Sequence, residues 1–169
     1  MKFVGLIVLL ILFNSCWPSS ISLIDKGSMP EEWKTFSLRT LENNAPSTPV
    51  SYAATLSERL KDGIQNNTRL MLNSETGGGE VVIEGKINGY SIAPIAIQPG
   101  DQAAKNRLTI SCDFSFLIRE PKEEKQTLSV SRFVDFDAAL NLASAENQLL
   151  EEINAQITQD VINKLLSNW

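Results

Sequence analysis

Histidine is absent from the whole sequence of 169 residues, and cysteine occurs only twice. The missing imidazole removes the commonest general base and the commonest zinc ligand, and it excludes Ser-His-Asp and Cys-His catalysis. A phosphate-binding glycine motif is also lacking, because the glycines at 77–79 are followed by neither a lysine nor a helical pattern. These absences argue against an enzyme, and we expect neither a metal nor a cofactor.

Positive charge is scarce as well. Lysine and arginine together number 15 against 20 aspartates and glutamates, which gives a net charge of −5. The basic residues form no block along the chain. Because nucleic-acid binding depends on cations that neutralise phosphates, we expect no nucleic-acid partner.

Long hydrophobic runs are limited to one, at residues 3–13, between Lys2 and the sequence Asn14-Ser15-Cys16. The run is too short to span a bilayer, which takes about 20 apolar residues, and its position is typical of a secretory signal peptide. A small residue before Cys16 fits lipoprotein processing, although Phe13 stands where a lipobox usually has leucine. The alternative is an ordinary signal peptide with a chance cysteine. We expect residues 1–15 to be removed and Cys16 to carry a lipid anchor, which several acyl chains make stable.

The rest of the chain divides into a tether and one domain. Residues 16–30 are rich in serine, with glycine and proline, and read as a tether. Residues 31–169 are enough for one domain with its own core. Cys112 lies between Ile110 and Phe114 at the two-residue spacing of one strand face. We therefore expect it to be a small buried hydrophobe without a disulfide partner.

The hydrophobic periodicity predicts strands at 33–41, 80–97, 108–118 and 126–136, with a possible short edge strand at 69–72. A parity change inside 80–97 predicts a bulge at Gly85 or Gly89. One helix is expected to open at Thr48-Pro49 and another at Ser144. Their apolar stripes are, respectively, Val50, Ala53, Leu56, Leu60 and Ile64, and Leu149, Ile153, Ile157, Val161 and Leu165.

This order, β-α-β-β-β-α, predicts an α+β two-layer sandwich in which two helices pack on one face of a mostly antiparallel four-stranded sheet. The first strand and helix would make a right-handed crossover into the sheet. For the last hairpin, a register with Ile118 opposite Leu128 pairs apolar residues with apolar residues. That register places Arg132 opposite Phe114 on the buried face.

The chain resembles the LptE family of lipopolysaccharide-assembly lipoproteins, in the form found in Bacteroidota. The similar stretches are residues 29–38, 84–94, 106–110, 131–137 and the closing helix up to Trp169. The resemblance implies the same sandwich fold and an outer-membrane lipoprotein that faces the periplasm. It also implies a non-enzymatic role as a plug inside LptD, the barrel partner, which it helps to assemble and to pass lipopolysaccharide to the outer leaflet.

Candidate contact residues follow from this reading. An apolar cluster is proposed for partner binding, with a core role as the alternative; it comprises Tyr90, Ile92, Pro94, Ile95 and Ile97. Lys105 and Arg107, which flank the turn after Pro99, suit the phosphates of lipid A or are merely solvated. Arg132 either contacts a phosphate or is structural, stacked on Phe114 or paired with a carboxylate of the last helix.

Two other functions remain open on the residues alone. A free-standing lipoprotein that binds a lipid or another ligand at its sheet would have a pocket between sheet and helices. A hydrolase that uses aspartate and glutamate would need two carboxylates about 5–10 Å apart in a cleft.

Overall fold

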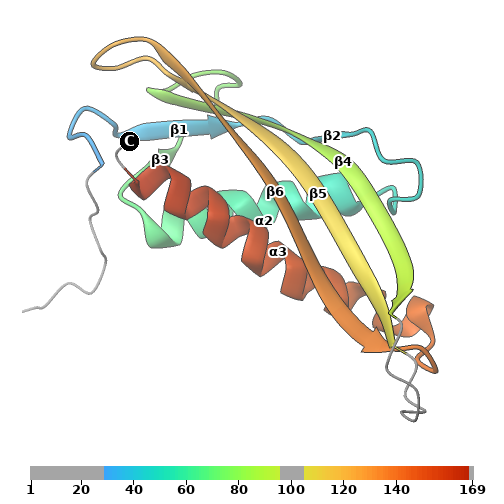
Figure 1. Cartoon of the computed structure of the whole chain (residues 1–169). Helices are drawn as coiled ribbons and strands as arrows, with labels where there is room; N and C mark the ends of the chain where they lie inside the picture. The colour runs from blue at the N-terminus through green and yellow to red at the C-terminus, as the bar shows by residue number, and fades with distance from the viewer. Residues whose placement is uncertain (1–28, 96–104, 168–169) are drawn as a thin grey trace, which may run out of the picture.

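The computed structural model describes residues 29–95 and 105–167, and the fold has two layers (Figure 1). Two helices, α2 and α3, lie along one face of a curved sheet, while the opposite face of the sheet is left open. No helix in these described ranges combines the length and the apolar character needed to span a membrane. The elements in chain order are β1 (Thr35–Leu38), β2 (Glu42–Asn43), α2 (Tyr52–Asn67), β3 (Met71–Leu72), β4 (Val81–Ile95), β5 (Lys105–Ile118), β6 (Glu124–Asp137) and α3 (Leu142–Leu166).

The sheet is mixed and has six strands, in the order β3-β1-β4-β5-β6, with β2 also paired to β4. Strands β4, β5 and β6 form an antiparallel meander, whereas β1 runs parallel to both β3 and β4, and β2 runs parallel to β4. The prediction of two helices on a sheet is confirmed, as is the short strand expected at 69–72. The expected four-stranded, mostly antiparallel sheet differs in detail, because the segment predicted as a first strand (33–41) contains only β1, and the additional short strands β2 and β3 make a mixed sheet with parallel pairs.

The core lies between the helices and the inner face of the sheet, which we define as the face that α2 and α3 cover. Alternate residues of β4 and β5 point inward, and Ile83, Ile87 and Ile110 are fully buried. The predicted stripe of α3 is buried along its whole length, with Ile153, Ile157 and Val161 at 0% exposure. Each such side chain contributes about 1.5–3 kcal/mol on burial, so this face of the sheet sets the position of both helices.

Strand β4 contains the predicted bulge, because its register against β5 shifts between Ile87 and Gly89. The extra residue changes which parity faces inward. Ile87 is buried before the bulge, and Tyr90 and Ile92 return to the inner face after it, opposite the buried Ile110 and Leu108. The bulge therefore keeps apolar side chains on the core side along the whole strand.

The register predicted for the last hairpin is wrong by four residues. Ile118 lies opposite Glu124 instead of Leu128, and Arg132 lies opposite Ile110 instead of Phe114. The observed register leaves a connection of only five residues between β5 and β6, and turn length fixes hairpin register as strongly as apolar matching does. An even shift preserves the faces, so the inner residues of β6 were still assigned correctly.

Both helix starts differ from the predicted ones. Residues 48–51 precede the helix instead of forming its first turn, with the amide of Tyr52 donating to the carbonyl of Pro49, and Val50 is 99% exposed. Val50 is therefore not part of the core. Helix α3 begins two residues before Ser144, because the Asn141 side chain accepts a hydrogen bond from the Ala143 amide at 3.0 Å.

The two helices meet through small and polar groups. Gly63 of α2 packs directly on the Thr158 methyl of α3, so a side chain at position 63 would collide with it. Nearby, the Tyr52 hydroxyl donates a buried hydrogen bond of 2.7 Å to Asn154 Oδ1. Gly63 is thus the point that lets α2 approach α3.

Candidate functional site

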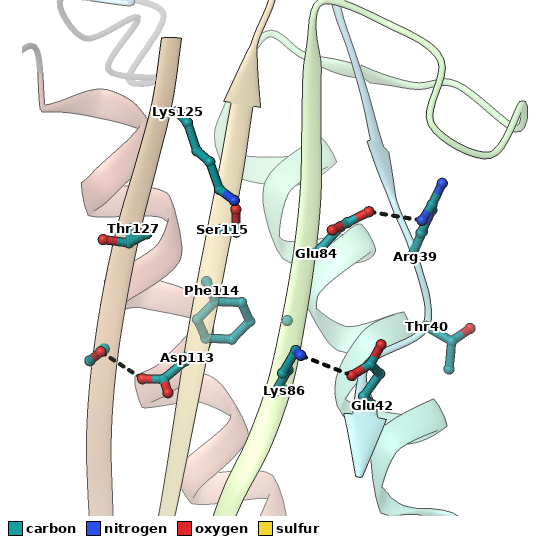
Figure 2. A pocket seen from close by; sticks show the side chains of 12 residues that line it. Arg39, Thr40, Glu42, Glu84, Lys86, Asp113, Phe114, Ser115, Lys125 and Thr127 are labelled. Atoms are coloured by element: carbon teal, nitrogen blue, oxygen red, sulfur yellow. Dashed lines mark hydrogen bonds and ion pairs between the residues drawn. The ribbon is translucent and has the colours of Figure 1, made fainter. Parts of the chain in front are cut away.

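One concavity of the described residues lies on the open face of the sheet. Figure 2 shows its side chains in front of the strands, with the helices behind them. This open-face hollow has a volume of about 560 Å³, within the range of small-molecule sites. It is lined by Arg39, Thr40, Glu42, Glu84, Gly85, Lys86, Asp113, Phe114, Ser115, Lys125, Thr127 and Ser129.

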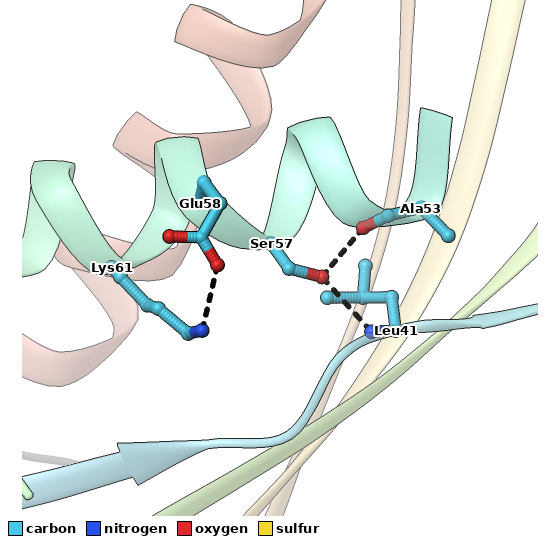
Figure 3. A network of polar contacts seen from close by, with 5 residues as sticks. All are labelled: Leu41, Ala53, Ser57, Glu58 and Lys61. Carbon is cyan, nitrogen blue, oxygen red and sulfur yellow. Dashed lines mark hydrogen bonds and ion pairs between the residues drawn. The ribbon is translucent and has the colours of Figure 1, made fainter. Parts of the chain in front are cut away.

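The hollow owes one rim to the break between β1 and β2. At that break the Leu41 amide donates to the Ser57 hydroxyl at 2.9 Å, and Ser57 in turn donates to the carbonyl of Ala53 in α2 (Figure 3). Leu41 is buried, so the connector is held down on the helix side. Arg39 and Glu42 on either side of it stay exposed and edge the hollow.

The floor depends on Gly85, which lies opposite Phe114 in the ladder. A Cβ atom at position 85 would lie 2.8 Å from the Phe114 ring, so only glycine lets the ring lie against the strand. Phe114 is 2% exposed and closes the hollow from the core side.

Charges in the open-face hollow are balanced and loosely held. Arg39 pairs with Glu84 at 2.9 Å and Lys86 pairs with Glu42 at 3.3 Å, and all four side chains are more than half exposed. Such pairs contribute only about 0.2–1 kcal/mol each, so a ligand can replace them at low cost. Lys125 has no ion-pair partner in the described part of the chain. The hollow can therefore receive a group that carries hydroxyls and a negative charge.

Asp113 is oriented by its neighbours on the same face. Its carboxylate accepts a hydrogen bond of 2.6 Å from the Ser129 hydroxyl and another from the side-chain amide of Asn88. Ser115 and Thr127 lie opposite each other on the neighbouring row, and their hydroxyls form no side-chain hydrogen bond with another described residue. The arrangement is suited to binding.

The predicted partner cluster does not form one surface. Tyr90 is half-buried on the inner face, where its hydroxyl donates to the Glu146 carboxylate of α3; burial, then this hydrogen bond, raises its pKa. Ile92 is 38% exposed on the same face, while Ile95 points to the opposite face across the strand from Lys105. Pro94 is exposed at the sheet edge, and Ile97 lies outside the described residues.

Arg107 is held by two partners on the open face, at the end of the sheet where β4 leads into β5. Its guanidinium donates two hydrogen bonds to Asp135, at 2.7 and 2.9 Å, and stacks 3.7 Å over the Phe133 ring. The hydrogen bonds from Arg107 lower the pKa of Asp135. Lys105 is the exposed neighbour on that face, opposite Asp137.

Arg132 is on the other face and belongs to a different site. Its guanidinium donates to Asp160 of α3, with 2.6 Å between Nε and Oδ2. The expected pairing with a carboxylate of the last helix is confirmed, and the side chain is 44% exposed instead of buried. The structure therefore brings Lys105 and Arg107 together and separates Arg132 from them.

Nothing in the described residues forms a catalytic centre of a known kind. Cys112 is 1% exposed, and burial, with a smaller effect of Asp113, raises its pKa to about 12, so it stays a neutral thiol. No group of three or more metal-ligating side chains occurs among these residues. Cys16, the predicted lipid site, lies outside the described range.

Sequence reasoning missed the open-face hollow. The alternation of β4 and β5 already places Glu84, Lys86 and Asp113 on the polar face, which is the signal that was available. The missing step was the parallel pairing of β1 and β2 with β4, which brings Arg39 and Glu42 to the same place.

Fold and site together define a two-layer α+β domain with a polar hollow on the open face of its sheet. The LptE sequence profile, described as lipopolysaccharide assembly, matches residues 33–165. The chain therefore belongs to the LptE family, a family of lipoprotein assembly factors of the cell envelope and not of known enzymes. No curated protein sequence matches the chain significantly.

Solved structures support the fold at low sequence identity. A minor lipoprotein from Acinetobacter baumannii has a TM-score of 0.52 at 12% identity, over 79% of this chain and 93% of that one. Lipoprotein B from Nitrosomonas europaea has a TM-score of 0.50 at 14% identity, over 87% and 88%. A Xanthomonas campestris protein has a TM-score of 0.52 at 10% identity, over 79% and 84%. These likenesses show the fold alone.

Proposed function

We propose that this chain is a lipid-anchored subunit of the outer membrane that plugs the LptD barrel and helps it assemble. The observation that carries the proposal is the family match over residues 33–165, which includes every described strand, helix α2 and all of α3 except its last residue. In this account Cys16 holds the domain at the periplasmic face of the membrane, and the protein is of the Bacteroidota type. The sandwich acts as a binding body and performs no chemistry.

For the docking surface we favour the end of the sheet where β4 leads into β5. Ile92 and Pro94 expose apolar area there, and on the opposite face Arg107 and Phe133 form a stacked pair with Phe133 47% exposed. Apolar side chains beside oriented charges are typical of protein interfaces. A plug would insert this end first into the lumen of its barrel.

Crosslinking in the native membrane tests this assignment. A photo-crosslinking residue at Ile92 should capture one larger outer-membrane protein. The matched control is Met71, an apolar residue that is 70% exposed on strand β3, near the start of β4 instead of its end. Equal capture from both positions would refute the choice of surface but not the partner, whereas capture from neither would count against the plug itself.

We assign contact with lipopolysaccharide to Lys105 and also to Arg107, whose guanidinium is less available for a ligand. Arg107 is already held by Asp135 and Phe133, whereas the Lys105 ammonium is exposed and forms no ion pair with any described residue. Arg132 is given the structural role, because Asp160 already holds its guanidinium. Lys105→Glu should lower binding of lipopolysaccharide to the purified chain, and Arg132→Lys should not.

A second candidate is a free-standing protein that binds a ligand at the open face. The open-face hollow favours it, because its unpaired Lys125 and its serine and threonine hydroxyls suit a phosphorylated sugar. This pocket is on the open face, and not between sheet and helices as this alternative predicted. Lys125→Ala should then abolish ligand-induced shifts in the NMR spectrum of β6 while leaving barrel capture intact.

A further inference from the structure

Strand β6 is a long edge of the described sheet, and charged side chains such as Lys125 and Arg132 are the protection that it carries. It pairs with β5 on one side, over all of its 14 residues, and with no described strand on the other. It contains neither proline nor glycine, and its register with β5 is unbroken by a bulge. Proteins normally blunt such an edge, because its outward N–H and C=O groups form a template for another strand.

We propose that a second copy of this chain pairs with β6 through its own β6, antiparallel, about a two-fold axis at Ser131. The two sheets would then continue into each other with the helices of both copies on one side. This inference does not depend on the proposed function, because it concerns the chain when no barrel protein occupies it.

Charge complementarity selects the second copy as the occupant. With Ser131 opposite Ser131, Lys125 of each copy lies opposite Asp137 of the other, and the open-face side chains of antiparallel partners point the same way. Asp137 would then lie between Lys125 of the second copy and Lys105, its partner on β5 in the same copy. The symmetry creates this favourable match twice and opposes no like charges directly.

Pairings of β6 with a second β6 that are shifted by one residue have less favourable charge contacts. Moving the axis to Arg132 places the two arginines opposite each other, which is destabilising. Moving it to Val130 places Lys125 opposite Asp135, whose carboxylate Arg107 already occupies with two hydrogen bonds. The register centred on Ser131 uses charges that form no ion pair among the described residues, although Asp137 Oδ1 also accepts a hydrogen bond from the Ala139 amide at 2.8 Å.

Apolar contacts on the inner face agree with this register. Leu128 is half-buried and would lie opposite Val134 of the second copy, and half-buried Val130 would lie beside the alkyl stem of the second copy's Arg132. A groove of about 510 Å³ runs between β6 and α3 along these residues, with Arg132, Asp160 and Lys164 on its walls. The second copy would extend over the mouth of this groove.

Cysteine trapping tests the geometry on the full lipidated chain, purified in detergent away from other proteins. Ser131→Cys should give a disulfide-linked dimer under mild oxidation, because the two sulfurs would face each other near the axis. The matched control is Ser111→Cys, since the Ser111 hydroxyl lies 3.0 Å from that of Ser131 on the same face but one strand further in. Equal crosslinking of both variants, or none from Ser131→Cys, would overturn the pairing.

A charge exchange tests the register without a covalent trap. Lys125→Asp and Asp137→Lys should each raise the dimer dissociation constant roughly tenfold in sedimentation, because each substitution puts like charges opposite each other twice. The double variant Lys125→Asp/Asp137→Lys should restore the wild-type constant. A wild-type chain that sediments as a monomer at all concentrations, or a double variant no tighter than the single ones, would refute the proposal.

Discussion

Gly63 offers the sharpest test of how the two helices are packed. Host–guest propensities alone favour Ala over Gly inside a helix by about 1 kcal/mol, so a reading of α2 in isolation predicts that Gly63→Ala stabilises the protein. In the structure, the added methyl would collide with Cγ2 of Thr158, which is itself only 8% exposed. Overpacking of this kind costs about 1–3 kcal/mol, and we therefore expect a net loss of up to about 2 kcal/mol.

A double-mutant cycle isolates the contact. Thr158→Ser removes the colliding methyl and by itself should cost about 0.8 kcal/mol, the value of one buried methylene. In the Thr158→Ser background, Gly63→Ala should become neutral or stabilising, which gives a coupling free energy of about 1–3 kcal/mol. The assay is urea unfolding of the mature chain followed by circular dichroism. If Gly63→Ala is stabilising in both backgrounds, the close approach of α2 to α3 is wrong.

Three further outcomes are expected. Arg107→Ala should raise the pKa of Asp135 towards its ordinary value, as measured by NMR titration. The depressed pKa of Asp135 stabilises the folded wild-type protein at pH values above the pKa of this carboxyl in the unfolded chain. That stabilisation is lost as the pH falls through the pKa of Asp135 in the folded protein. In a Cys16→Ser chain, Cys112 is the only thiol and should react with a thiol reagent only after unfolding, since burial raises its pKa to about 12. The same Cys16→Ser change should release the protein from the membrane fraction, and a chain that stays in that fraction would contradict the lipid anchor.

Local patterns in the sequence were sufficient to predict the elements that depend only on hydrophobic periodicity. The apolar stripe of α3 from Leu149 to Leu165 and the alternation from Leu108 to Ile118 are each long enough to be unambiguous, and both face the core. The bulge beside Gly89 was also predictable, because a parity change has to be absorbed somewhere and glycine tolerates it.

Features that depend on contacts between distant segments were not predictable in this way. The register of β5 against β6 is set by the short turn after Ile118, which apolar matching alone misjudged. The break between β1 and β2 depends on the hydrogen bond from the Leu41 amide to Ser57, 16 residues further along the chain. Because that break forms a rim of the open-face hollow, the hollow was invisible from the sequence as well.

The pairing of charged side chains was also only partly predictable from the sequence. The pairing of Arg132 with Asp160 was among the expected partners, because both could be placed near the helix–sheet boundary. The pairing of Arg107 with Asp135 was not anticipated, since it requires the correct hairpin register to bring the two residues opposite each other. Residue type alone identified arginines and lysines that could bind an anion. The strand register determines which of these side chains are already paired with a carboxylate.

Purification of the lipidated chain from native outer membranes under mild detergent tests the central claim most directly. The account predicts that the chain elutes with one β-barrel protein in equal amounts, and that the pair resists separation until the barrel is denatured. A chain that elutes free of any larger protein, with or without prior crosslinking, would contradict its role as a barrel plug.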